Sequence, residues 1–248
     1  KAGFANICTP SKRIAILCVG ILLAGELHIS KIARFLKGDT QQDSRVRWIE
    51  RLLKANFLKT EWVYQPMLTE ALKSFKDKRW HLVIDRTTLW DAKVDLATIS
   101  LNYRKRAIPL VWRRVAFGGA PLATYIDLVR ECIPLIPAKV KVVFHGDTEF
   151  GGAAMIRALR QIGWDFMLAQ FKSAHFREAG ASSTKALATL AVTRRRSCKL
   201  KSIDLFSYKP LGDINIFAFY QPVLCNLRRV DVVFSALARK HHRVHAAS

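Results

Sequence analysis

Apolar residues recur three and four positions apart between residues 11 and 57, a spacing that is typical of amphipathic helices. Ser30 and Ser44 stand where helix-capping side chains are preferred. The run at residues 14–24 is the most apolar of the chain but too short to cross a bilayer, so we expect a buried helix there. The pattern predicts helices at residues 14–24, 28–36 and 44–53, followed by further helix and linker from 62 to 80.

From His81 the pattern changes to short β-branched and aromatic runs between turn residues, which is typical of strands. Three predicted strands follow one another, and then helix, strand, helix and strand alternate. This order indicates an α/β fold with a mixed sheet. The predicted strands are residues 81–85, 95–102, 107–116, 139–146 and 165–170, and the predicted helices are residues 121–136 and 153–162.

The pattern weakens after Phe171, where a basic, turn-rich stretch suggests an insertion between core elements. Strands are expected again at residues 199–203 and 214–220, and a helix is expected after Pro222. The predicted organisation is a helical, helix-turn-helix-like region at 1–78, a core at 79–170, a basic insertion at 171–210 and an altered C-terminal segment at 211–248.

The charge of the chain is strongly one-sided, with 41 Lys and Arg against 19 Asp and Glu and a net charge of +22. Charge of this size indicates a polyanionic partner, of which nucleic acid is the first choice and an anionic membrane surface the rival. The basic residues are spread along the chain and do not gather on one amphipathic helix, which argues against a membrane partner.

The predicted N-terminal helices carry basic residues on their outer faces, as a small helix-turn-helix-like DNA-binding unit does. Ordinary solvated charges on a helical bundle explain these residues equally well. The candidate DNA-binding residues are Lys31, Arg34, Arg45, Arg47 and Arg51, together with Arg194, Arg195 and Arg196 in the insertion.

The composition narrows the class of protein further. Half of the residues are hydrophobic, which excludes a disordered tail. The 5 cysteines are odd in number, widely spaced and without metal-ligand spacing, so neither disulfides nor structural zinc is indicated. We expect a cytoplasmic, nucleoid-associated protein.

Two aspartates close two of the predicted strands, because Asp85 follows the run at 81–84 and Asp147 follows Gly146. If these strands are neighbours, the two carboxylates face one another, and like charges at close range are tolerated mainly when a cation lies between them. The pair therefore predicts a divalent metal site. The alternative for each aspartate alone is a local Asx-turn or the cap of the next helix.

The order of elements and the residues on them resemble DDE transposases of bacterial insertion sequences, which have a ribonuclease H-like core. The resemblance covers roughly residues 12–170, and Thr148 stands where the family usually carries Arg. The matching segments are residues 83–87 (Val-Ile-Asp-Arg-Thr), 107–112 (Ala-Ile-Pro-Leu-Val-Trp), 146–151 (Gly-Asp-Thr-Glu-Phe-Gly) and 163–166 (Gly-Trp-Asp-Phe).

The resemblance implies DNA cleavage and the joining of the freed 3′-hydroxyl to target DNA. It implies that Asp85 bridges two Mg²⁺ (or Mn²⁺) ions about 4 Å apart and that Asp147 holds one of them. The implied partner is double-stranded DNA, as transposon ends and target, and a homodimer in the DNA complex is compatible with it.

The third carboxylate of the family has no counterpart in this chain. In the family it is a Glu on a helix, in a Tyr-x-x-Arg-x-x-x-Glu-like pattern, whereas no glutamate follows Glu178 here. Asp231 is the acidic residue that comes nearest to this position, but its spacing from Tyr220 does not match the pattern of the family. Three readings stay open: an insertion-sequence transposase that is impaired by this loss, a non-catalytic DNA-binding remnant, and a metal-dependent nuclease of the same fold.

Overall fold

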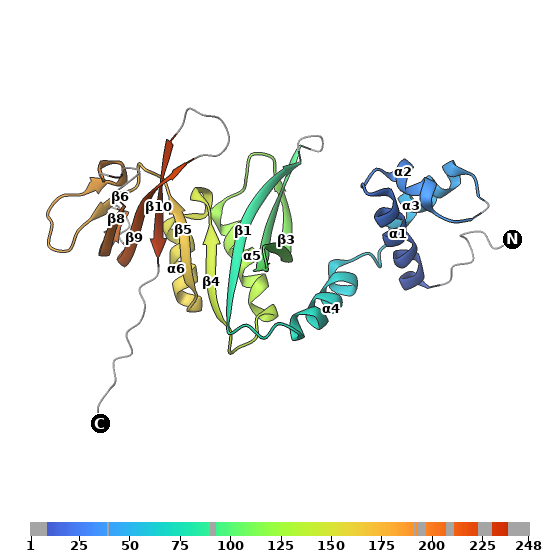
Figure 1. Cartoon of the computed structure of the whole chain (residues 1–248), viewed down its shortest axis with the longest axis horizontal. Coiled ribbons are helices and arrows are strands. Elements are labelled where there is room, and N and C mark those ends of the chain that lie inside the picture. Colours follow the sequence, from blue (N-terminus) through green and yellow to red (C-terminus); the bar gives the residue numbers. More distant parts are fainter. Residues whose placement is uncertain are drawn as a thin grey trace, which may run out of the picture. The chain divides into compact units, whose positions relative to one another are not determined.

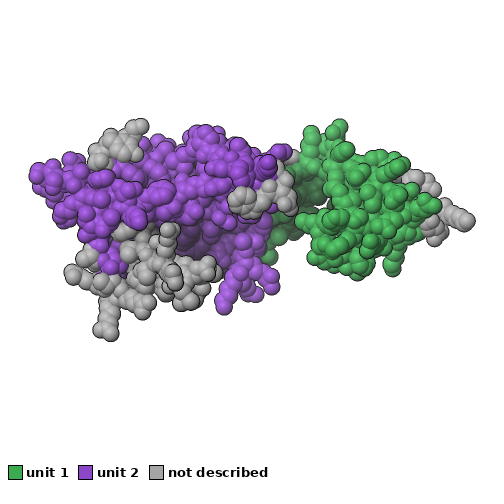
Figure 2. Space-filling view, turned by 90° about the horizontal axis from the view of Figure 1, so that it is seen from above, with its two compact units in different colours: residues 1–75 green, residues 76–248 purple. Residues whose placement is uncertain are grey.

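The computed structural model describes residues 9–38, 40–89, 93–190, 192, 197–206, 211–222 and 230–237, with the backbone alone for 61, 219–222 and 230–237. The chain forms two compact units, Lys1–Phe75 and Lys76–Ser248, which Figure 2 shows in green and purple. Each unit has its own set of secondary-structure elements.

Unit 1 is helical, as the apolar spacing predicts, but its helices begin earlier than the serines expected to cap them. The N-cap positions belong to His28 and Gln41, so Ser30 and Ser44 lie inside the first turns and the capping prediction is wrong. The helices of unit 1 are α1 (Pro10–Ala24), α2 (Ile29–Phe35), α3 (Gln42–Leu53) and α4 (Thr60–Lys73) (Figure 1).

The core of unit 1 lies between α1, α2 and α3. At Gly20 of α1 an added Cβ would lie 2.7 Å from Cδ2 of Leu36, so the absence of a side chain lets α1 lie close to the chain at the end of α2. The buried residues of this core are Leu17, Ile32, Ala33, Leu36, Ile49 and Leu52.

Helix α1 is only partly buried, which corrects the expectation of a buried helix. Leu22 is 80% exposed, and Val19 and Leu23 are each 54% exposed. The helix is apolar on all sides, so its sequence does not reveal which side faces the core. In the described part of the chain no single helix is long and apolar enough to cross a membrane. Helices α1 and α2 have sufficient length and apolar character only when taken together, and they are bent by 101° relative to one another.

Unit 2 is built on one mixed sheet, whose strand order is β3-β2-β1-β4-β5-β10-β9-β8-β6-β7. Strands β1, β2 and β3 are antiparallel neighbours, whereas β4 and β5 run parallel to β1. This arrangement confirms the predicted α/β core with a mixed sheet. Its strands are β1 (Arg79–Leu89), β2 (Val94–Tyr103), β3 (Arg106–Ala116), β4 (Lys141–Gly146) and β5 (Asp165–Gln170).

The helices of this core cover one face of the sheet. Helix α5 packs on β2 and β3, α6 packs on β5, and the two helices touch each other (Figure 1). Alternate residues of β1 and β4 are buried on this side, and the residues between them are more exposed and form the opposite face, called the open face below. The helices are α5 (Leu122–Cys132), followed by the 3₁₀ turn η3 (Ile133–Leu135), and α6 (Ala153–Ile162).

The segment expected as an insertion, and the C-terminal segment after it, continue the sheet. The prediction of a helix after Pro222 is wrong within the described residues, because Val230–Leu237 forms the strand β10. This strand is rich in valine and pairs with both β5 and β9. The remaining elements are β6 (His175–Arg177), β7 (Lys185–Ala186), the 3₁₀ turn η5 (Leu187–Thr189), β8 (Cys198–Leu205) and β9 (Leu211–Pro222).

Candidate metal and nucleic-acid site

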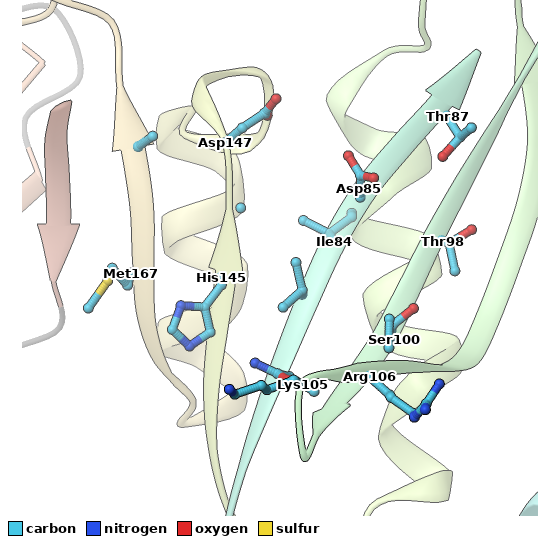
Figure 3. Close-up of a pocket in the computed structure, with 15 residues that line it drawn as sticks. Ile84, Asp85, Thr87, Thr98, Ser100, Lys105, Arg106, His145, Asp147 and Met167 are labelled. Carbon is cyan, nitrogen blue, oxygen red and sulfur yellow. The ribbon is translucent and has the colours of Figure 1, made fainter. Parts of the chain in front are cut away.

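The two aspartates lie at one level of two adjacent strands. Parallel pairing of β1 with β4 sets Val83 opposite His145, and Asp85 and Asp147 follow two residues later on each chain segment. Residues two apart share a face of a sheet, so both aspartates belong to the open face. Figure 3 shows Asp85 on β1 and Asp147 just after β4.

Asp85 does not end its strand, contrary to the expectation from sequence. Strand β1 continues to Leu89, because Asp85 and the residues after it pair with β2, where Thr98 is opposite Asp85. The apolar run does stop at Asp85, and pairing with β4 is present only up to Val83. Loss of the parallel neighbour, and not the end of the strand, gives Asp85 its exposed position.

The carboxyl of Asp147 lies in an environment that disfavours its negative charge. Burial raises the pKa of Asp147, and the negative charges of Glu149 and Asp85 raise it further, against the backbone amide of Glu149 and the charge of Arg86. Ionised Asp147 is therefore held at a free-energy cost. A bound cation would remove that cost.

The local role expected as the alternative for Asp147 is confirmed, because this residue caps the 3₁₀ turn η4 (Thr148–Phe150). Its Oδ1 accepts a hydrogen bond from the amide of Glu149 at 3.0 Å. In the described part of the chain, no protein donor bonds its Oδ2 or either carboxylate oxygen of Asp85. The cap fixes the side chain and leaves an oxygen for a ligand.

Glycines on both sides of Asp147 let its turn lie tightly against β5. An added Cβ on Gly151 would lie 2.3 Å from the carbonyl oxygen of Ala169, and one on Gly146 would lie 3.0 Å from side-chain atoms of Ile84 and Leu168. Phe150 is fully buried beneath the turn. These contacts hold the turn that carries Asp147 against the core of the sheet.

A network of ionic hydrogen bonds joins the two strands beside the aspartates. Arg86 Nε donates to both carboxylate oxygens of Glu149, at 2.9 Å and 2.8 Å, and Arg86 Nη1 donates to Asp95 Oδ2. The amide of Gly118 donates to the same Asp95 oxygen at 3.0 Å, and the hydroxyl of Tyr125 donates to Glu149 Oε1 at 2.8 Å. The network ties the turn after β4 to β1 and β2.

The sequence analysis missed this network, although its position held a clue. Arg86 directly follows Asp85, and Glu149 stands two residues after Asp147, so each aspartate has a charged neighbour in its motif. Because hydrogen bonds to Glu149 and Asp95 raise the pKa of Arg86, its cation is committed to these two carboxylates. Its charge also lowers the pKa of Asp147, but this is the smallest of the effects on that carboxyl.

A cavity of about 880 Å³ lies on the open face (Figure 3). Asp85 and Asp147 line one part of it, and Lys105 and Arg106 line another. Between these two parts, the cavity is lined by Thr98 and Ser100 of β2, whose side chains carry hydroxyls. The cavity therefore joins carboxylates, hydroxyls and cations on a single surface.

Two histidines also lie on the open face. His81 Nδ1 and His145 Nε2 are 2.9 Å apart and share a hydrogen bond. Burial lowers the pKa of His145, and the proximity of His81 lowers it further. His145 is thus neutral at pH 7, and it adds a polar but uncharged group to the cavity.

The donor set fits a hard divalent cation. Carboxylate oxygens suit Mg²⁺, which commonly uses one or two protein carboxylates and completes its shell with water and substrate phosphate oxygens. Mn²⁺ accepts the same ligands. Across the residues that the structure describes, no group of three or more His, Cys, Asp or Glu side chains could hold a metal, so Asp85 and Asp147 have no third ligand of these four residue types there.

The basic residues predicted to bind DNA have unequal surroundings. Lys31, Arg34 and Arg47 are exposed in unit 1, although Lys31 Nζ forms an ion pair with Glu26 at 2.7 Å. Arg51 is exposed, and its Nε donates to the carbonyl oxygen of Arg47 at 3.3 Å.

Arg45 has a structural position in unit 1. Its Nη2 donates to the carbonyl of Gly38 at 2.5 Å, and its Nη1 donates to the carbonyl of Ala33 at 3.5 Å. These bonds join α3 to the end of α2, so the guanidinium is occupied by the protein backbone. The predicted residues Arg194, Arg195 and Arg196 lie outside the described residues.

Fold and site together define an α/β protein with two carboxylates on the open face of a mixed sheet. No protein-family model matches the chain, and no curated protein matches it. Solved structures that match include the piggyBac transposase synaptic complex with hairpin DNA, at 11% identity and a TM-score of 0.46, over 97% of this chain and 55% of that chain.

Another match is Marinitoga piezophila Argonaute in complex with 5′-OH guide RNA, at 11% identity and a TM-score of 0.32, over 86% of this chain and 32% of that chain. The chain thus spans about half the length of the transposase chain and a third of the Argonaute chain. Its own geometry is the basis for the assignment of a function.

Proposed function

We propose that this chain is a transposase of the insertion-sequence type that binds double-stranded DNA and holds a divalent metal ion at Asp85 and Asp147 for phosphodiester cleavage and transfer, with its activity impaired because the third carboxylate is absent. The observation that carries the proposal is the placement of two carboxylates at one level of adjacent parallel strands, in one cavity. The net charge of +22 supports a polyanionic substrate. Transposon ends and target DNA are the proposed partners.

Each residue of the proposed site has its own role. Asp85 and Asp147 would hold Mg²⁺ or Mn²⁺, which supplies Lewis-acid polarisation of the phosphodiester. The amide of Glu149 fixes one oxygen of Asp147, and Arg86 ties the turn to β1 through Glu149, so the spacing of the carboxylates is set before substrate arrives. Thr98 and Ser100 present hydroxyls to a strand in the cavity.

A second function is favoured by one observation, the lack of a third metal-ligating side chain beside the pair among the described residues. Such a chain would retain DNA binding and bind metal weakly, which is the behaviour of a non-catalytic transposase remnant. Cleavage without strand transfer would instead identify a nuclease of the same fold.

Metal binding is the test that separates a metal site from two local caps. Mg²⁺ or Mn²⁺ should raise the melting temperature by mass action, with a gain of about 2.7 kcal/mol in unfolding free energy at a hundred times Kd. Asp85→Asn and Asp147→Asn should each abolish the response. Asn retains the capping oxygen at position 147, so the second variant removes the charge and keeps the turn.

Asp165→Asn is the matched control, because Asp165 is an exposed aspartate of the same sheet at the first position of β5. It should leave the metal response unchanged. A response of wild-type size in both the Asp85 and the Asp147 variant would refute the proposal.

A further inference from the structure

The part of the cavity distant from the aspartates is formed by the β2–β3 hairpin, which carries three successive cations, Arg104, Lys105 and Arg106. Arg104 and Lys105 have φ angles of +47° and +64°, so both central residues are left-handed, as a tight two-residue hairpin turn requires. Arg104 lies over the ring of Tyr103, 5.2 Å from its centroid. Lys105 and Arg106 line the cavity itself (Figure 3).

Lys105 and Arg106 form no ion pair with an acidic residue within the described residues. The ion pairs found there are formed by other lysines and arginines. Both side chains are exposed. Asp85 and Asp147 are the acidic residues of the cavity lining, and they lie away from this hairpin (Figure 3). The charge of the hairpin is therefore available to an anion in the cavity.

The spacing along β2 suits a nucleic-acid strand. Thr98 is opposite Asp85, and Tyr103 is opposite Arg106, so the carboxylates and the hairpin cations are separated by five residues of β2. At about 3.4 Å per residue this is on the order of 17 Å. Phosphates of one strand of B-DNA rise about 3.4 Å per nucleotide along the helix axis, so about five nucleotides cover the distance when that axis runs along β2.

We propose that Lys105 and Arg106 bind backbone phosphates of the same DNA strand that presents its reacting phosphate to Asp85 and Asp147, about five nucleotides away. This inference rests on the proposed function, and it names the path of the substrate across that site. Thr98, Ser100 and Asn102 lie along the path with groups that hydrogen-bond to phosphate or sugar. Val83 and Met167 add apolar surface for deoxyribose carbons.

The first test measures binding of labelled duplex DNA in EDTA, at several salt concentrations, by the variant Lys105→Asn/Arg106→Gln. Asn tolerates the left-handed backbone of position 105, and equal melting temperatures will show that the hairpin is intact. Loss of two phosphate contacts should lower the slope of log affinity against log salt by about 1.8, and affinity at 0.1 M salt by on the order of tenfold per residue.

The control Lys172→Asn/Lys201→Gln removes two exposed lysines of unit 2 that do not line the cavity. It should change the slope far less. If both double variants lose the same affinity, the hairpin contributes only general charge and the inference is wrong.

The second test asks whether one strand meets both ends of the cavity. In EDTA, Asp85→Asn should increase DNA affinity by removing repulsion from the reacting phosphate, and this gain should shrink when Lys105 and Arg106 are also replaced. An equal gain in both backgrounds would overturn the shared path. The measurement needs no metal, so it distinguishes failure of this inference from failure of the proposed metal chemistry, which the melting experiment reports.

Discussion

Arg86 is the residue on which the geometry around the two aspartates depends. It stands beside Asp85 in β1 and binds Glu149, which itself fixes Asp147 through its amide. Its other partner, Asp95, is fully buried. A single guanidinium therefore pairs with two carboxylates while it connects the two strands that carry the site.

Arg86→Leu should lower the free energy of unfolding by about 3–5 kcal/mol, because removal of one partner leaves a buried carboxylate without compensation. Urea denaturation at pH 7 measures the loss. Arg130→Leu is the control: Arg130 pairs with Asp127 at 2.8 Å on the surface, and such pairs contribute about 0–1 kcal/mol. Equal losses in the two variants would contradict the structural role of Arg86.

Asp95 gives a prediction about pH. Burial alone raises its pKa, but hydrogen bonds from Thr88 and Arg86, the charge of Arg86 and the hydrogen bond from the amide of Gly118 lower it overall. A lowered folded-state pKa stabilises the fold above the ordinary carboxyl pKa of about 3.9, and this stabilisation is lost as the pH falls through the folded-state value.

Asp95→Asn should therefore be less stable than the wild type at pH 7, and the difference should narrow as the pH is lowered toward 3. Urea denaturation at a series of pH values measures both curves. Parallel curves would show that the titration of Asp95 does not contribute to acid unfolding.

At the scale of elements, the turn between β4 and α6 decides where Asp147 lies. Gly151→Ala should destabilise the fold by about 1–3 kcal/mol through overpacking, since the new Cβ would meet the carbonyl oxygen of Ala169 at 2.3 Å. Gly152→Ala should cost less, because its near neighbour is the end of the flexible Leu122 side chain, at 2.8 Å. Thermal denaturation compares them, and an equal effect would refute the tight-turn explanation.

Periodicity predicted the elements of the core well, because the local sequence determines helix and strand patterns there. The helix Ala153–Ile162 and the strand Asp165–Gln170 are found at the expected residues. The strand Val230–Leu237 was missed, since its place depends on pairing with β5 and β9, which are distant in the chain.

The candidate site was predictable only in part. Two aspartates at the ends of apolar runs are visible in the sequence, and the register of β1 with β4 brings them to one level. The cavity-lining role of Lys105 and Arg106 could not be predicted, because it depends on the direction in which the β2–β3 hairpin extends over the open face. Long-range register, and not composition, decides such placements.

At the scale of the whole molecule, the position of the late acid Asp231 bears on catalysis. Its backbone lies on β10, next to β5, where Ser235 is opposite Ala169. Position 147 is level with Ala169 on β5, and therefore with Ser235 on β10. Position 231 thus lies two strands across the sheet from position 147 and four residues along β10 from that level. Strand spacings of about 4.8 Å and rises of about 3.4 Å per residue place the two backbones about 17 Å apart. Ligands of one metal ion must lie far closer than this.

We therefore expect this chain to be a poor or inactive strand-transfer catalyst. Two-metal catalysis requires placement of both ions to within about 0.5 Å, and two carboxylates leave one ion held mainly by water and substrate. Loss of such electrostatic stabilisation slows reactions by a factor of about 10²–10³. The decisive assay is cleavage and joining of plasmid and candidate transposon-end DNA with Mn²⁺. Robust activity that Asp85→Asn abolishes would overturn this expectation, and its abolition by Asp231→Asn as well would identify Asp231 as the third ligand, against the distance derived from strand register.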